Sequence, residues 1–205
     1  NRNLSLNLDR NSFSARNLYI YGSIDNGGYI NLTDATVSRF IRSSNNDVVF
    51  DNVNVGESVI AQKHINGTNS DVGGYVDSYA GGVTLNNVDV GSYIEARDQI
   101  KTTNGDVGGH ISSSHGGIQA VSNSAHLISG YVSAQESIKV TNYRINQYIF
   151  SEDYVQLNNT NVNGDVTSRS SGNPAVEVLN NSSVSGDITA KGFIRVSDSS
   201  VSGDI

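Results

Sequence analysis

Aromatic residues recur at one position of a short sequence repeat, and they are the strongest candidates for ligand binding in this sequence. The position holds Tyr75, Tyr93, His110, Tyr131 and Tyr148 in the middle of the chain. A row of exposed rings could stack on sugar rings or receive another protein surface, because tyrosine combines a large contact area with a polar tip. The alternative is that the rings pair across strands and stabilise a sheet, by about 0.2 to 1 kcal/mol per pair. Both interpretations stay open.

The same position holds aspartates near the end of the chain, at Asp165, Asp187 and Asp204. Like charges one repeat apart repel each other, and calcium could relieve the repulsion because it prefers oxygen ligands. The GGxGxD calcium repeat is absent, however. Solvated carboxylates that prevent sideways pairing between sheets are the alternative explanation. We expect no cofactor, with calcium at these aspartates as the exception to test.

Catalytic chemistry receives little support from the residue pattern. The histidines are His64, His110, His115 and His126, and no nucleophile or carboxylate recurs at a set spacing from them. Cysteine is absent, which excludes disulfides and thiolate metal sites. Repeats of nearly constant length also leave no long loops to build a cleft. We expect a protein that is not an enzyme, with a polysaccharide lyase or hydrolase as a less favoured alternative.

An internal repeat positions these residues. Units of about 17 to 22 residues follow one another from Ile30 to Ile205, and the phrase VSGDI occurs twice near the end. In VDVGSYIEA, apolar side chains alternate with polar ones, which is the period of a half-buried strand. The composition agrees, with 21 Gly, one Pro and many Asn, Ser, Thr, Val and Ile residues. Each unit is too short to fold alone, so the units must stack.

The repeat predicts an all-β fold, namely a single-stranded right-handed parallel β-helix, or β-solenoid, of about 10 to 11 coils. Coils about 4.8 Å apart would make a rod roughly 50 Å long. We expect residues 1–22 to form an N-terminal cap or an imperfect first coil and residues 23–205 to form the solenoid. Because Ile205 ends the chain on a core position without a cap, we expect either a segment of a longer chain or a docking end.

Two columns set the register of the coils. A side-chain amide or carboxylate recurs at one turn and could hydrogen-bond its copies in adjacent coils. This ladder contains Asp34, Asn52, Asn69, Asn87, Asn104, Asn123, Asn142, Asn159, Asn181 and Asp198. An aliphatic residue closes each phrase and should stack into the core. This column contains Ile24, Ile41, Ile60, Val76, Ile94, Ile111, Val132, Ile149, Val166, Ile188 and Ile205.

The charge and the hydropathy limit the partners. A net charge of -7 argues against nucleic acid, which requires a basic surface. No apolar run in this piece approaches the roughly 20 residues of a membrane span. A glycan, a surface protein or another copy of the chain remains.

The stretch VSGDITAKGFIRVSDSSVSGDI resembles the bactofilin-type polymer-forming repeat, and the resemblance extends from about Val155 to Ile205. It implies a short right-handed β-helix that joins end to end into filaments without nucleotide. The Asn-, Ser- and Thr-rich turns elsewhere resemble the secreted β-helices of bacterial autotransporter and filamentous-haemagglutinin-like adhesins. Neither resemblance brings catalytic residues, and both imply a structural role.

The sequence as a whole therefore predicts a secreted or cell-surface β-solenoid. We expect a rigid segment of a bacterial adhesin or fibre that binds a glycan or protein along its side. The low lysine content, the acidic balance and the absence of Cys and Met fit an exported protein. The alternative is a self-assembling filament protein, which would fit the cytoplasm.

Overall fold

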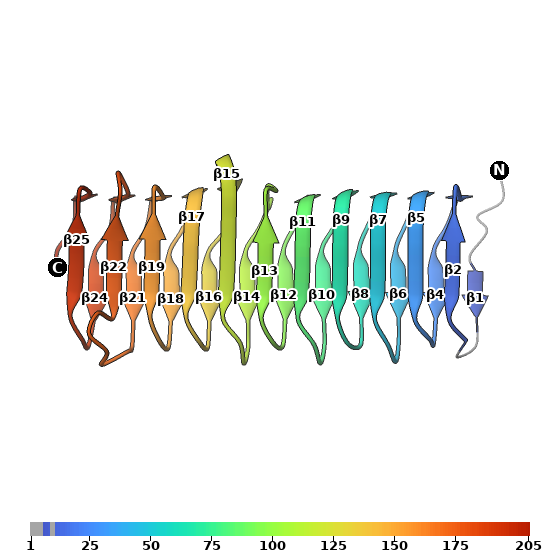
Figure 1. Ribbon diagram of the computed structural model, residues 1–205, viewed down its shortest axis with the longest axis horizontal. Coiled ribbons are helices and arrows are strands. Elements are labelled where there is room, and N and C mark those ends of the chain that lie inside the picture. The colour runs from blue at the N-terminus through green and yellow to red at the C-terminus, as the bar shows by residue number, and fades with distance from the viewer. Residues whose placement is uncertain (1–5, 9–10) are drawn as a thin grey trace.

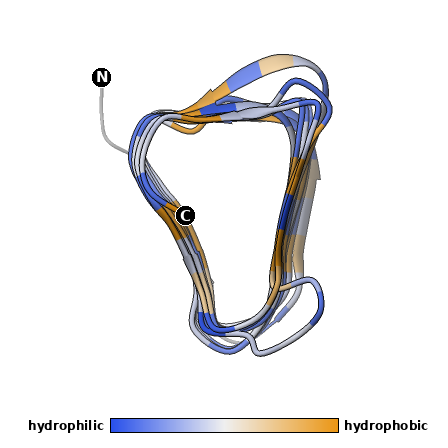
Figure 2. Cartoon of the chain, turned by 90° about the vertical axis from the view of Figure 1, so that its left-hand side faces the viewer, coloured by the Kyte–Doolittle hydropathy of each residue, from blue (hydrophilic) through white to orange (hydrophobic). Residues whose placement is uncertain are grey.

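The computed structural model describes residues 6–8 and 11–205, and these residues form a parallel β-solenoid of about ten turns without a helix. Figure 1 shows the strands side by side along a rod. Viewed along the rod in Figure 2, the coils superpose on a closed, triangular outline. No helix in the described part of the chain has the length and apolar character that a membrane span requires.

Two parallel sheets form most of the wall, and we name them the short-strand sheet and the long-strand sheet. Within the described residues, the short-strand sheet has 11 strands, in the order β1 (Leu6–Leu8), β4 (Ile24–Asn26), β6 (Ile41–Ser43), β8 (Val59–Ala61), β10 (Val76–Ser78), β12 (Ile94–Ala96), β14 (Ile111–Ser113), β16 (Val132–Ala134), β18 (Ile149–Ser151), β21 (Val166–Ser168) and β24 (Ile188–Ala190). The described part of the long-strand sheet has 15, in the order β2 (Phe13–Arg16), β5 (Ile30–Val37), β7 (Val48–Val55), β9 (Ile65–Val72), β11 (Val83–Val90), β13 (Ile100–Thr103), β15 (Ile118–Ile128), β17 (Ile138–Ile145), β19 (Val155–Asn158), β22 (Val176–Leu179) and β25 (Ile194–Ser197), with β3 (Tyr19–Ile20), β20 (Asn161–Val162), β23 (Ser183–Val184) and β26 (Ser200–Val201) beside this path.

The register confirms the predicted repeat. Ile24 pairs with Ile41, 17 positions later (41 − 24), and Val166 pairs with Ile188, 22 positions later (188 − 166). In the expected N-terminal cap region, β1, β2 and β3 pair with β4 and β5, while residues 1–5, 9 and 10 lie outside the described residues.

Two expected core positions are wrong: Ile205 is 70% exposed, and Ile60 is displaced from the core by one residue. Val59 pairs with Ile41 and with Val76, and it is fully buried, whereas Ile60 faces outward. The two neighbours are both aliphatic, so the hydrophobic pattern alone fits either. With Val59 inside, Ala61 also faces the core, and the Ser58 hydroxyl accepts a hydrogen bond from the backbone N–H of Tyr75.

The core is a stack of aliphatic side chains with close contacts between coils. Phe50 is fully buried, and it lies over Gly67 of the next coil. A Cβ atom at Gly67 would lie 2.3 Å from Cζ of Phe50, so the glycine is what makes room for the ring. Buried serines at strand ends donate to main-chain carbonyls of the preceding turn, as Ser43 does to Gly28 and Ser113 to Asp98, both at 2.7 Å. These bonds satisfy polar groups that face the interior.

The long strands bend at residues in the left-handed conformation, which Asn and Asp tolerate better than most residues. Most ladder positions have positive φ, namely Asp34, Asn52, Asn69, Asn87, Asn104, Asn142, Asn159, Asn181 and Asp198, and Asn17 and Asn180 share it. Their side chains link coils: Nδ2 of Asn52 donates to Oδ1 of Asp34, and Nδ2 of Asn159 to Oδ1 of Asn142, both at 2.7 Å.

Asn123 departs from this ladder. It lies in an irregular part of β15 between Val121 and His126, where extra residues shift the register, and Figure 1 shows β15 extending beyond its neighbours. Asn123 has no positive φ, and its backbone N–H donates to Oδ1 of Asn104 at 2.9 Å. At this bend the Asn104 side chain therefore bonds to the main chain of Asn123, where a regular bend has a bond between two ladder side chains.

Candidate functional site

The aromatic column forms a continuous stack on the outside of the rod. Each of its five members, Tyr75, Tyr93, His110, Tyr131 and Tyr148, directly precedes a strand of the short-strand sheet, from β10 to β18. Consecutive ring centroids lie 4.8, 5.1, 4.5 and 5.0 Å apart, and the ring planes are within 6° of parallel. The coil repeat sets this spacing, because neighbouring strands lie about 4.8 Å apart. We call these five rings the aromatic stack.

The aromatic stack presents ring edges to solvent, because the rings cover one another's faces. Tyr148 is 43% exposed and the other four are half-buried. Burial raises the pKa of Tyr93 and of Tyr131, so both phenols keep their protons at neutral pH. A partner at the middle of the stack would meet hydroxyl groups and ring edges. Stacking of a sugar on a ring face is therefore not available there.

Alternation along the strands places a polar surface beside the aromatic stack. Tyr75, Asp77 and Tyr79 all face outward from one coil, separated by the buried Val76 and Ser78. Strand pairing aligns Asp77 with Glu95 and Glu95 with Ser112. The result is a grid of outward side chains, three from each of three successive coils, which we call the polar-aromatic grid. Its members are Tyr75, Asp77, Tyr79, Tyr93, Glu95, Arg97, His110, Ser112 and Ser114.

A shallow pocket of about 270 Å³ lies over this grid, and its walls include Asp77, Tyr79, Glu95, Arg97, Ser112 and Ser114. Burial, and secondarily the charge of Glu95, raises the pKa of Asp77 to about 6. Oε1 of Glu95 lies 3.0 Å from Nε2 of His110. Within the described residues, no ion pair or side-chain hydrogen bond reaches the Asp77 carboxylate.

Sequence reasoning predicted the aromatic stack but missed the carboxylates beside it. The signal was available in GYVDSYA and GSYIEAR, which align on their tyrosines and have an acid two residues later in both. A period of 2 places tyrosine and acid on the same face. Only the register between coils shows that the two acids are direct neighbours.

Asp165 and Asp187 use their side chains to link successive coils, and Asp204 receives the second link through its backbone N–H. Oδ1 of Asp165 accepts the backbone N–H of Asp187 at 3.0 Å, and Oδ1 of Asp187 accepts that of Asp204 at 2.8 Å. These carboxylates are exposed, and each bond fills a place in the main-chain hydrogen-bond ladder.

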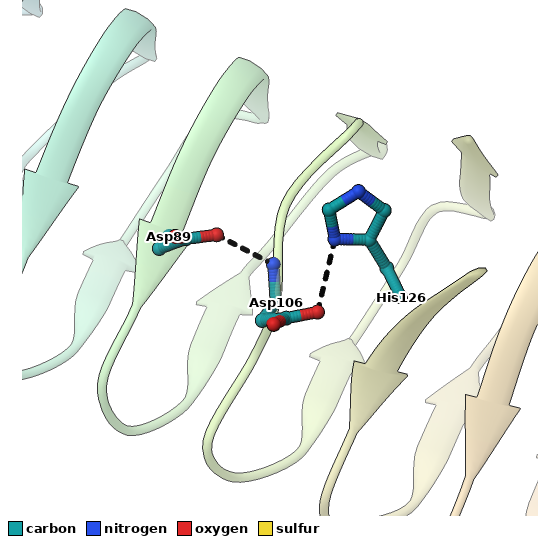
Figure 3. Close-up of side chains that lie close together, drawn as sticks. All are labelled: Asp89, Asp106 and His126. Carbon is teal, nitrogen blue, oxygen red and sulfur yellow. Dashed lines mark hydrogen bonds and ion pairs between the residues drawn. The ribbon is translucent and has the colours of Figure 1, made fainter. Parts of the chain in front are cut away.

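The same device recurs at Asp89, Asp106 and His126 (Figure 3), the single group of three clustered metal-type ligand atoms found among the described residues. The backbone N–H of Asp106 donates to Oδ1 of Asp89 at 2.8 Å, and that of Leu127 donates to Oδ1 of Asp106 at 2.7 Å. Nδ1 of His126 lies 2.9 Å from the same Asp106 oxygen. These atoms hold the bend next to the irregular part of β15.

A wider depression of about 450 Å³ follows the bends of the long strands. Asp34, Asn52 and Asn69 are among its lining residues, and they belong to the side-chain hydrogen bonds that connect the coils. These three side chains therefore already have structural partners. The pocket over the polar-aromatic grid is smaller, but it adjoins the aromatic stack and contains Asp77, a half-buried carboxylate beside a second acid, so we consider it the better candidate.

Comparison of the chain with protein-family models, curated proteins and solved structures finds no match. The function proposed for this protein therefore rests on the geometry of the rod and its side chains.

Proposed function

We propose that this chain is a non-enzymatic rod, exposed at a bacterial surface or secreted, that forms a rigid segment of an adhesin or fibre. It binds a glycan or a protein partner along its side. The observation that carries the proposal is the aromatic stack, a straight row of five parallel rings along one side of the rod. Half-buried tyrosines offer contact area at a low cost in side-chain entropy.

Two features support binding along the side. Each inner coil pairs with both of its neighbours, so the spacing of the rings is held by the main chain. The ring edges and hydroxyls form a narrow ribbon bordered by the carboxylates Asp77 and Glu95. Such a ribbon suits hydrogen-bonded recognition of a repetitive partner.

The test must separate binding from stabilisation, because stacked rings do both. Replacing both Tyr93 and Tyr131 by Phe keeps the stack and removes two hydroxyls, whereas replacing both by Ser removes the rings. We expect both double variants to fold, and the Ser variant to unfold at a lower temperature. Binding to a panel of immobilised oligosaccharides and surface-protein extracts should weaken in both variants. Unchanged binding in the Ser variant would reject this face.

Electron microscopy of the purified chain over a concentration series tests the alternative of a self-assembling filament. Isolated rods at every concentration agree with the proposed function. Filaments that grow by end-to-end addition would contradict it and would make the termini the functional surfaces.

A further inference from the structure

The pocket over the polar-aromatic grid contains two carboxylates that face outward from adjacent coils. Asp77 on β10 and Glu95 on β12 are paired in register, so their Cα atoms are separated by a single strand spacing of about 4.8 Å. Glu95 has His110 at 3.0 Å from one oxygen. Asp77 has no ion pair or side-chain hydrogen bond among the described residues. Asp77 therefore presents a half-buried carboxylate whose acceptors are open to a ligand, beside a second carboxylate that keeps one oxygen free of His110.

A cationic group would satisfy this pair better than a neutral one. A neutral hydroxyl has one proton, so it can donate to only one of the two carboxylates, and it leaves their mutual repulsion in place. A protonated amine brings three donors and a positive charge, which favours ionisation of both acids. The acidic balance of the chain, with a net charge of -7, acts in the same direction at longer range.

The remaining walls of the pocket fit a sugar ring. Tyr79 is 58% exposed, and it is not a member of the aromatic stack, so a face of its ring is accessible. Arg97, Ser112 and Ser114 supply donors and hydroxyls for sugar oxygens. The volume of about 270 Å³ lies just below the roughly 300 to 1,000 Å³ of pockets for drug-sized ligands. It suits a single sugar unit of a chain that continues along the rod.

We propose that this pocket binds an amino sugar within a glycan, with the protonated amine between Asp77 and Glu95 and the sugar ring against Tyr79. The inference rests on the proposed function, because the proposed function is what places a glycan along the side of the rod. It adds the chemical class of the ligand and the residues that select it. The aromatic stack then forms one edge of the site.

Isothermal titration calorimetry with two matched probes tests the assignment on the full chain. The probes are the trimer of β-1,4-linked glucosamine and the same trimer with every amine acetylated. We expect the free amine form to bind and the acetylated form to bind at least about tenfold more weakly, because acetylation removes the charge. Equal binding of the two trimers would overturn the proposal.

Three variants locate the site. Asp77→Asn and Tyr79→Ala should each weaken binding of the glucosamine trimer by about tenfold or more. Asp71→Asn is the matched control, because Asp71 and Asp89 form another in-register acid pair on the long-strand sheet, away from this pocket. It should leave the affinity unchanged. An equal loss in Asp71→Asn would mean that net charge alone attracts the trimer and would overturn the site.

The pH dependence gives an independent readout. Asp77 is faced by Tyr75 and Tyr79 from its own coil, by Tyr93, Glu95 and Arg97 from the next, and by the apolar Ile60 from the preceding one. Because its pKa is about 6, the ionised form that attracts the amine is lost as the pH falls below that value. The affinity of the glucosamine trimer should fall over this range in the wild type and stay flat there in Asp77→Asn. The same fall in both proteins would contradict the role of Asp77.

A third probe, trilysine, distinguishes an amino sugar from the lysine amines of a protein partner. Trilysine offers amines without a sugar ring, so it should bind more weakly than the glucosamine trimer and should not respond to Tyr79→Ala. Equal affinity for trilysine would overturn the sugar assignment. Failure of both trimers to bind would overturn this inference alone, since the proposed function fails separately, through unchanged binding in the Tyr93 and Tyr131 double variant.

Discussion

Asp77 and Glu95 lie directly opposite each other on β10 and β12, with both acids on the outer face of the same sheet. The folded chain thus holds one carboxylate half-buried beside another. Burial and the neighbouring charge raise the pKa of Asp77 from 3.8 to about 6. Such a residue costs stability, which is common where side chains serve binding.

We predict that Asp77→Asn stabilises the protein at neutral and alkaline pH. A raised pKa in the folded state means that the native chain holds this proton more tightly than the unfolded chain does. Because of Asp77, the free energy of unfolding is thus highest below about pH 4, where the carboxyl is protonated in both states. It decreases as the pH rises through about 6, where the folded chain loses this proton. After allowance for solvent screening, the gain in unfolding free energy at about pH 8 should be about 1 kcal/mol. Chemical denaturation at about pH 8 and about pH 4 measures it, and an equal effect at both would contradict the prediction.

The bend at Asn87 provides a test of left-handed backbone geometry. Asn87 has a φ of 57°, and its Nδ2 donates to Oδ1 of Asn69 at 3.1 Å. Asn87→Ala should lower the unfolding free energy by about 1 to 2 kcal/mol, because alanine is strained there. Asn87→Gly loses the same amide but accepts the conformation, so it should cost less. Equal losses in the two variants would assign the effect to the hydrogen bond instead of the backbone.

Gly67 and Phe50 should behave as a coupled pair. A methyl group at Gly67 would lie 2.3 Å from Cζ of Phe50, so Gly67→Ala should destabilise the fold by about 1 to 3 kcal/mol through overpacking. Phe50→Leu removes the atoms in conflict. In the double variant, Gly67→Ala should therefore cost much less than it does alone, as a double-mutant cycle of denaturation midpoints would show. Additive losses would mean that the two side chains do not compete for space.

Glu177 should make the protein sensitive to acid. It is buried on β22, where Tyr154 donates to Oε2, Gln156 donates to the same oxygen at 3.0 Å, and Arg195 donates to Oε1 at 3.4 Å. The hydrogen bond from Tyr154 is the main cause of the lowered pKa of Glu177. Its contribution to stability is therefore complete above the unfolded pKa, near 4.5, and is lost as the pH falls through the folded one.

Glu177→Gln should thus lower the unfolding free energy by about 1 to 3 kcal/mol at neutral pH and weaken its decline in acid. Glu57→Gln provides the comparison, because the Glu57–Arg39 pair is exposed and should matter little. A larger loss in Glu57→Gln than in Glu177→Gln would contradict the prediction.

The repeat and its alternation were sufficient to predict the solenoid, because every coil must present matching residues to the next. The error at Ile60 has a local cause: Val59 and Ile60 are adjacent aliphatic residues, and only pairing with Ile41 and Val76 selects between them. Asn123 has a different cause. Extra residues in β15 move it away from the bend, and a sequence of small polar residues does not reveal where a strand bulges.

The candidate site also has features that the sequence predicts and features that only the folded structure shows. The column of Tyr75, Tyr93 and Tyr131 follows from the repeat alone, whereas the covering of one ring face by the next depends on side-chain rotamers. The pairing of Asp77 with Glu95 depends on register, and the raised pKa of Asp77 depends on burial as well. Neither the pairing nor the raised pKa can be predicted from the residue types along one strand.

The pairing of each coil with only its neighbours has a mechanical consequence. Under tension applied to its two ends, such a rod yields by peeling coils from an end, since strand pairing among the described residues joins each coil only to its immediate neighbours. A coil of 17 residues, as from Ile24 to Ile41, lengthens the chain by roughly 55 Å when it is pulled straight. Longer coils, such as the one from Val166 to Ile188, yield larger steps. A rod built this way extends in increments and dissipates load while the remaining coils stay folded.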